Sequence, residues 1–220
     1  MISEILIRII LLFIFSKIVY YYPGLEKYSK TTKFNFYRSL MCLYFSFYST
    51  DLIINNFKEG ISSPIIYKNI NFNDVTNWFI SYLIYDLIIV LSSKKKRLDL
   101  IIHHSFCLFI YSYQKITNHC NFTFVMLLIA EVMSIVSGID NMAKENNNIK
   151  LSCKLKKTRL FIIRNIRIPI WIISILICIR FNKHFSNLFE FYLCLGGPLL
   201  MIYLDNYWEN KCIKFIRKNS

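Results

Sequence analysis

Two adjacent histidines, His103 and His104, are the residues whose type and position most suggest chemistry in this chain. Near neutral pH an imidazole can act as a general base or as a nucleophile. Successive side chains on a helix point about 100° apart, so the two rings cannot address one partner. We expect one ring to line a cavity and the other to hold a neighbouring helix. Asp99, four residues before His103, would share its helix face.

Charged residues on neighbouring apolar segments lie at depths that match the histidine pair. A rise of ~1.5 Å per residue, counted from the nearest basic loop, places the histidines about 9–10 Å deep. The same count places Asp86 about 12 Å deep, Glu131 roughly 13 Å deep, and Arg164 and Arg167 between about 10 and 15 Å deep. Intramembrane charges are costly and are functional candidates by default, so we expect a polar cavity open to the cytoplasmic leaflet. Alternatively, carboxylate–arginine pairs only lock the bundle, and Arg164 reaches the interface.

The composition places these charges in a membrane protein. Of the 220 residues, 55% are hydrophobic and 17% aromatic, with only 5 glycines and 4 prolines. This excludes an intrinsically disordered chain and a collagen-like one. The net charge of +14 would also suit nucleic-acid binding, but only if the cations clustered on a soluble surface.

Seven apolar segments have, or nearly have, the roughly 17–20 residues that a membrane-spanning helix needs. They are residues 2–22, 34–57, 76–93, 98–113, 122–139, 160–181 and 188–207. The first lacks a small-residue cleavage site, which favours a span over a signal peptide. We therefore expect an all-α, multi-pass membrane bundle of about seven transmembrane helices.

The cations alternate from one connection to the next. Seventeen lysines and arginines lie after the first, third, fifth and last segments, and only four lie in the opposing connections. The positive-inside rule then predicts an N-terminus outside or in the lumen and a cytoplasmic C-terminus. Charge that orients spans argues against nucleic-acid binding. The longest connections are residues 58–77 and 141–158, and we divide the chain into a first helix with its connection, 1–31, and a main domain, 32–217.

Other chemistries lack their motifs. The four histidines are too few for a membrane di-iron site, and no CxxC, GxGxxG, GxxxxGK[ST], GxSxG or HExxH occurs. The seven cysteines include no pair in the outside loops, so no disulfide framework is indicated. We expect no metal ion and no cofactor.

Four short motifs occur in an order that is characteristic of one family. They are FYRS at 36–39, YLIYDLII at 82–89 followed by His103 and His104, AEVMS at 130–134, and LFIIRNIRIP at 160–169. Together they resemble the TLC domain of the translocon-associated, longevity-assurance (ceramide synthase) and ceroid-lipofuscinosis membrane proteins, over roughly residues 32–217.

The resemblance implies a multi-pass protein of the endoplasmic reticulum, or of another endomembrane, that is concerned with lipid. In the ceramide synthase branch, paired histidines and later acidic residues transfer an acyl chain from acyl-CoA to a sphingoid amine, and His103 and His104 match that pair. The synthases add a second His-Asp…Asp cluster on the next span, where this chain has Glu131 and Ser134, with Asp140 only at the end of the span. That version resembles the non-synthase members, whose roles lie in lipid composition, sensing or trafficking.

The first functional hypothesis is therefore a non-catalytic membrane protein that binds or regulates lipids. Its partners would be membrane lipids, not nucleic acid, with a homo-oligomer left open. The residues assigned to a headgroup, or to CoA phosphates in an enzyme, are Asp86, Arg164, Arg167, Lys94, Lys95, Lys96 and Arg97.

The second hypothesis is an acyl-CoA-dependent N-acyltransferase, with acyl-CoA as co-substrate only. His103 or His104 would act as base or acyl-accepting nucleophile, and Glu131 would orient the imidazolium as the acid of a catalytic triad does. A more remote alternative is a small seven-span transporter or receptor, for which residues 98–113 form a short span.

Overall fold

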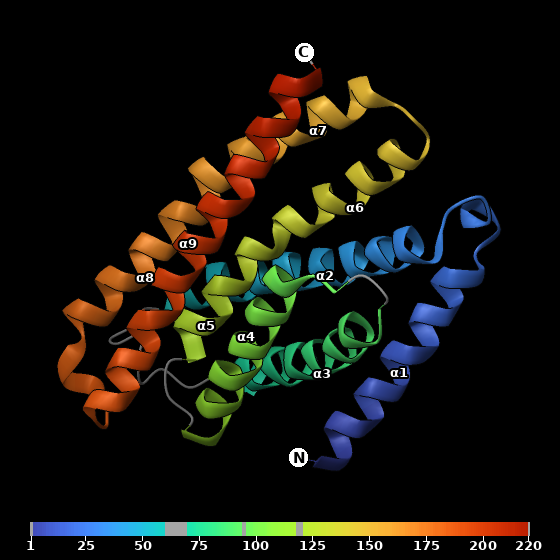
Figure 1. Cartoon of the computed structure of the whole chain (residues 1–220). Helices are drawn as coiled ribbons and strands as arrows, with labels where there is room; N and C mark the ends of the chain where they lie inside the picture. Colours follow the sequence, from blue (N-terminus) through green and yellow to red (C-terminus); the bar gives the residue numbers. More distant parts are fainter. Residues whose placement is uncertain (1, 60–69, 94–95, 118–120, 220) are drawn as a thin grey trace.

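A computed structural model describes residues 2–59, 70–93, 96–117 and 121–219, and these form helices and contain no strand (Figure 1). The main helices are α1 Ile2–Tyr21, α2 Lys30–Glu59, α3 Ile70–Ser92, α4 Leu98–Thr117, α5 Asn121–Leu128, α6 Val132–Glu145, α7 Ile149–Ile162, α8 Ile168–Arg180 and α9 Leu188–Asn219. The expected all-α class is confirmed.

Two pairs of helices are continuous rods with an irregular turn inside. A 3-10 turn over Ile129–Glu131 joins α5 to α6, and a π turn over Ile163–Arg167 joins α7 to α8. Within the described residues, four helical stretches are long and apolar enough to cross a membrane. These are Phe72–Ser92, Thr123–Glu145, Ile149–Arg180 and Leu188–Asn219. The chain is accordingly an integral multi-pass membrane protein.

One predicted linker is wrong. Residues 141–158 were expected to form a long connection, but α6 and α7 run through them and leave only residues 146–148 between the helices. The turn is tight because Asn147 adopts a φ of 55° and the side chain of Asn148 caps α7 by accepting from the Leu151 N–H at 3.0 Å. The cations that follow are good helix formers once the helix has begun. Most of the other long connection, residues 60–69, lies outside the described residues.

The helices pack around two apolar clusters. α2 lies along α6, α3 along α4, and α7 and α8 pack against α9, while α4 also contacts α9. One cluster fills the space between α2, α3, α4 and α5, and the other lies between α6, α8 and α9. In Figure 1, α1 lies at the edge of the bundle, where it packs against α2 and α3.

Large apolar side chains also cover the outside of α1. An exposed apolar face of this extent is a liability in water but the ordinary surface of a helix in lipid. The exposed residues on this helix include Leu6, Ile7, Ile10, Leu11, Phe13, Ile14 and Ile18.

A close approach of α2 to α6 depends on a glycine. A Cβ placed on Gly138 would lie 1.9 Å from Oγ of Ser39, so only glycine lets the two helices meet here. The Ser39 hydroxyl donates to the carbonyl of Ser134 on α6 at 2.9 Å. Small residues that allow backbones to approach are typical of helix contacts in membranes. This contact fixes the part of α6 that carries the candidate site.

Candidate functional site

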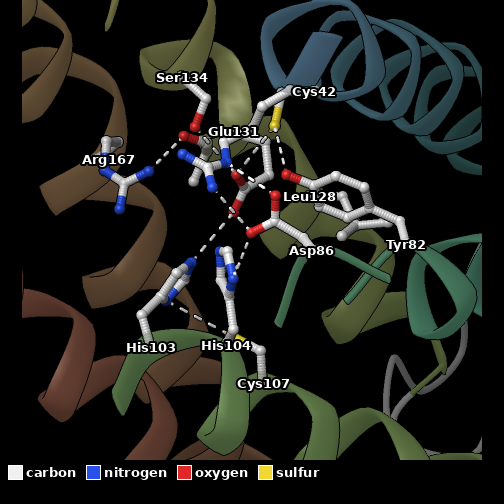
Figure 2. Close-up of polar contacts among 12 residues, drawn as sticks. Cys42, Tyr82, Asp86, His103, His104, Cys107, Leu128, Glu131, Ser134 and Arg167 are labelled. Carbon is white, nitrogen blue, oxygen red and sulfur yellow. Dashed lines mark hydrogen bonds and ion pairs between the residues drawn. The ribbon is translucent and has the colours of Figure 1, made fainter. Parts of the chain in front are cut away.

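A polar cavity of about 350 Å³ lies between α2, α4, α6, α7 and α9. Ten of its lining residues are Lys, Arg, His or Glu. Membrane helices bury such groups only in pairs or facing a cavity. The polar layer expected from the sequence is therefore organised around an open space, and its two histidines face different partners (Figure 2).

His104 is held by a buried carboxylate of α3. Its Nδ1 lies 2.7 Å from Oδ2 of Asp86, whose side chain is 0% exposed. Arg38 of α2 donates to both oxygens of the same carboxylate, at 3.0 and 3.1 Å. The Asp86 carboxylate thus joins three helices. Its bidentate ion pair with Arg38 is the strongest of these contacts. Asp86 lies beside the histidine pair, as its depth indicated.

His103 faces the 3-10 turn instead. Its Nε2 lies 3.8 Å from Oε1 of Glu131, a distance longer than a hydrogen bond. The other oxygen of Glu131 accepts weakly from Cys42 at 3.5 Å and from Ser134 at 3.4 Å. On its other side, Nδ1 of His103 lies 3.5 Å from Sγ of Cys107. The two rings therefore have separate partners, as their angular separation requires.

Arg167 is buried at the side of the cavity. The π turn directs its guanidinium to Asp205 of α9, which accepts from Nε at 2.8 and 3.1 Å, while Nη1 donates to the carbonyl of Ala130. Asp205 also accepts from the indole N–H of Trp171 at 2.7 Å. The Nη2 group of Arg167 has no partner although the residue is only 2% exposed. This free donor belongs to a residue that lines the cavity.

Arg164 does not join the polar layer. It donates to Glu209 of α9 at 2.9 and 2.5 Å, and its side chain is 57% exposed. Residues three apart on an α-helix lie only about 60° from each other, but the wider π turn separates Arg164 from Arg167. Of the two arginines, Arg167 lines the cavity and Arg164 does not, and the alternative of an interfacial Arg164 agrees with its exposure.

The mouth of the cavity carries more cations than carboxylates. Asp140 is shared by Lys156 at 2.8 Å, Lys144 at 3.0 Å and Arg159 at 3.9 Å. The Nε of Arg159 is buried without a partner. All three of these cations line the cavity, so its mouth favours an anion.

The predicted basic loop after α3 contributes one residue to this mouth. Arg97 lines the cavity and pairs with Asp99 at 2.5 Å, and Lys211 of α9 approaches Asp99 at 3.9 Å. Lys96 is exposed and does not line the cavity. Lys94 and Lys95 lie outside the described residues. Asp99 thus contacts two cations at the mouth of the cavity. It also lies four residues before His103 and shares its helix face.

Charged residues of the site that were missed as ion-pair partners include Arg38, Asp205 and Asp140. Arg38 was noted only as part of a motif, although it lies within an apolar segment and so met the criterion for a candidate. Asp205 lies six residues before Lys211, about 9 Å deep by the same helical count, and could have been found in that way. The sharing of Asp140 could not be foreseen because α7 was expected to be a loop.

A narrow apolar slot continues from the cavity toward the other end of the bundle. It has a volume of about 30 Å³, and both His103 and Glu131 line it as well as the cavity. Its walls come from α3, α4, α5, α8 and α9, and Gly197 and Pro198 form part of them inside an unbroken α9. Gly197 permits a close approach, since a Cβ there would lie 3.1 Å from Ile110. Gly197 and Pro198 therefore form part of the slot wall, in addition to any effect that they have on the shape of α9.

Among the described residues, no group of three or more His, Cys, Asp or Glu side chains has the arrangement of a metal site. In a comparison with known families, residues 34–214 match the model described as TLC domain. No curated protein and no solved structure matches the chain.

Proposed function

Because this chain belongs to the TLC domain family of membrane proteins, we propose that it binds a membrane lipid and thereby regulates or senses lipid composition. The lipid's polar group occupies the cavity, and only the first part of its acyl chain borders the slot, whose volume of about 30 Å³ is close to that of a single water molecule in the liquid. The observation that carries this proposal is that one polar cavity and one apolar slot share His103 and Glu131. An amphiphile is the ligand class that matches a charged chamber continuous with an apolar one.

The charge at the mouth indicates an anionic headgroup. Lys144, Lys156 and Arg159 share a single carboxylate, and Arg97 and Lys211 share another. An arginine or lysine that lacks a full partner binds phosphate or carboxylate oxygens by charge-assisted hydrogen bonds. The mouth therefore selects lipids with a negative headgroup over zwitterionic ones.

The topology that fits this proposal has seven spans, an N-terminus outside or in the lumen, and a cytoplasmic C-terminus, in the endoplasmic reticulum or a related membrane. It is supported by the alternating cations, since the positive-inside rule favours a mouth on the cytoplasmic side. A tag inserted at Asn146 should react with a membrane-impermeant reagent added from the cytoplasm, and a tag at Ser63 should not. The reverse pattern would overturn the orientation.

Lipid binding is tested with purified protein in nanodiscs made from a mixed phospholipid extract. Native mass spectrometry should find a retained lipid, enriched in anionic species over the surrounding bilayer. The double change Lys156→Ala with Arg159→Ala should abolish that enrichment, whereas Lys157→Ala, an exposed cation on the same helix, should not. No retained lipid in the unchanged protein would remove the proposal.

A second candidate function is the acyl-CoA-dependent N-acyltransferase. It is favoured by the position of Glu131 beside His103, because a general base of this kind is an imidazole that a neighbouring carboxylate orients. Membranes supplied with labelled acyl-CoA and a long-chain base would form an N-acyl product that disappears in His103→Ala. His104→Ala would also reduce it, through loss of the Asp86 contact. No histidine-dependent product across several amines would eliminate this candidate.

A further inference from the structure

Three cations converge on a single oxygen atom at the mouth of the cavity. Oδ2 of Asp140 lies 2.8 Å from Nζ of Lys156 and 3.0 Å from Nζ of Lys144. The same oxygen lies 3.9 Å from Nη1 of Arg159. Oδ1 of Asp140 accepts from the hydroxyl of Ser152 at 2.5 Å. Both oxygens of this carboxylate are therefore engaged, and its one negative charge faces three positive ones.

These three cations have more donors than the carboxylate can accept. An ammonium group carries three N–H donors and a guanidinium carries five. Only one donor of each lysine can point at the shared oxygen, and within the described part of the chain the buried Nε of Arg159 has no partner. A buried donor without an acceptor is costly. An anion with several acceptor oxygens would satisfy the donors that remain.

A second carboxylate at the mouth is also outnumbered by cations. Asp99 pairs with Arg97 at 2.5 Å and is approached by Lys211 at 3.9 Å. Lys211 lies one helical turn before Phe215 on α9, and the Phe215 ring centroid is 4.8 Å from Nζ of Lys156. All five cations line the same cavity. The two groups of cations therefore surround one opening.

The inner part of the cavity shows no such surplus of cations among the described residues. Arg38 pairs with Asp86, and Arg167 pairs with Asp205, so each arginine has its own carboxylate. Glu131 adds a carboxylate that has only weak contacts. An anion would be repelled by Glu131 there, but attracted at the mouth, where five cations share two carboxylates.

We propose that the mouth binds the phosphate monoester of a membrane lipid. The inference rests on the proposed function, in that a lipid occupies the cavity, and it names the headgroup. A phosphate monoester has three terminal oxygens and a charge of about −1.5 to −2 at pH 7. A phosphodiester has two terminal oxygens and a single charge, so it leaves more donors unmet and compensates less of the positive charge. Charges removed from water are stable only when they are paired, which favours the monoester.

The rest of the cavity favours a lipid over a free phosphate as the source of this group. α6 places Asp140 nine residues after Glu131, about 13 Å along the helix, so a phosphate at the mouth leaves the space beside Glu131 for other atoms. The slot that begins there has largely apolar walls. An amphiphile matches both surroundings, whereas a free phosphate matches only the mouth.

The test uses the purified full-length protein in phosphatidylcholine nanodiscs that contain equal small amounts of phosphatidate and phosphatidylglycerol with the same acyl chains. Both minor lipids are anionic, but only phosphatidate carries a phosphate monoester. Native mass spectrometry should find phosphatidate retained in preference to phosphatidylglycerol by roughly tenfold or more, the effect of one additional charge-assisted hydrogen bond.

Lys144→Gln should reduce this preference by roughly tenfold, because it removes a cation from the mouth. Asp140 keeps its contacts with Lys156 and Arg159, so the helices stay joined. Lys157→Gln, an exposed cation on α7, is the matched control and should leave the preference unchanged. The unfolding midpoint of both variants, measured in the same nanodiscs, shows that they are folded.

A competition experiment distinguishes the two sources of a phosphate monoester. Inorganic phosphate and glycerol 3-phosphate carry the group without acyl chains, and at millimolar concentrations they should not displace phosphatidate. Displacement by either would show that the mouth binds a soluble phosphate and would overturn the lipid as its source.

Two further results would overturn the proposal. Equal retention of phosphatidate and phosphatidylglycerol contradicts the phosphate monoester but agrees with the proposed function, since an anionic lipid is still bound. A preference that Lys144→Gln leaves unchanged shows that the phosphate lies elsewhere than at the mouth. No retained lipid of any kind in the unchanged protein contradicts the proposed function itself.

Discussion

The two neighbouring histidines have contrasting surroundings. His104 lies against a carboxylate that is fully buried and doubly bound by Arg38. His103 lies against a carboxylate at 3.8 Å that has only weak partners and borders open space. Buried charges with complete pairing hold helices together, whereas a loosely paired acid beside a cavity is free to meet a ligand. We therefore assign a structural role to His104 with Asp86. We assign contact with the ligand to His103 with Glu131.

The largest effect is expected from Asp86→Ala. It leaves the Arg38 guanidinium buried without its partner, and breaking a buried pair in this way costs about 3–5 kcal/mol. Unfolding in mixed micelles, titrated with SDS, would measure the loss of free energy. Asp51→Ala, an exposed carboxylate on α2, is the control and should change little. If Asp86→Ala and Asp51→Ala lose the same free energy of unfolding, Asp86 does not have the structural role assigned to it.

A smaller loss of stability is expected from Gly138→Ala. The added methyl group would overlap Ser39 and push α2 away from α6, and overpacking of this kind costs typically ~1–3 kcal/mol. Because Ser134 lies at that contact, lipid retention should fall as well. Gly196→Ala, where a Cβ meets nothing within 4 Å, is the matched control. A Gly138 variant as stable as this control would show that the helices adjust.

Glu131→Gln should separate function from stability. The amide keeps the shape of the side chain and loses only weak contacts, so about 1 kcal/mol or less of stability is at stake. The histidine-dependent N-acyl product of the acyltransferase candidate, however, should fall by roughly 10²-fold or more, because the imidazolium loses its counter-charge. The same two measurements on Asp86→Asn should give the opposite ranking. If both variants behave alike, the contrast between the histidines is not functional.

The smallest effect is expected from Arg164→Ala. Its pair with Glu209 is more than half exposed on the arginine side, and such pairs contribute about 0–1 kcal/mol. Unfolding free energy and lipid retention should both stay within error of the unchanged protein. Arg167→Ala, measured in parallel, should lose several times more stability because its partner Asp205 is completely buried.

The sequence predicted the depth of the charged residues in the membrane better than the direction in which each side chain points. The lengths of the apolar segments predicted the helices. Counting residues from the ends of these segments predicted that Asp86, Glu131 and the two histidines lie at similar depths. It did not predict which way Arg164 and Arg167 face, because that depends on a π turn that composition does not encode. Nor did it predict helix at residues 149–158, where a cation-rich stretch looks like a loop until its cap and its carboxylate partner are known.

The π turn over Ile163–Arg167 has a consequence for chain length. A turn of this kind holds one residue more than an α-helix needs. Deleting Asn165 would remove that extra residue and let α7 and α8 join as a regular helix, with the two halves keeping their relative orientation. The π turn therefore absorbs a one-residue insertion that a regular helix would pass on as a rotation of about 100°, and Arg167 keeps its buried pair with Asp205 of α9.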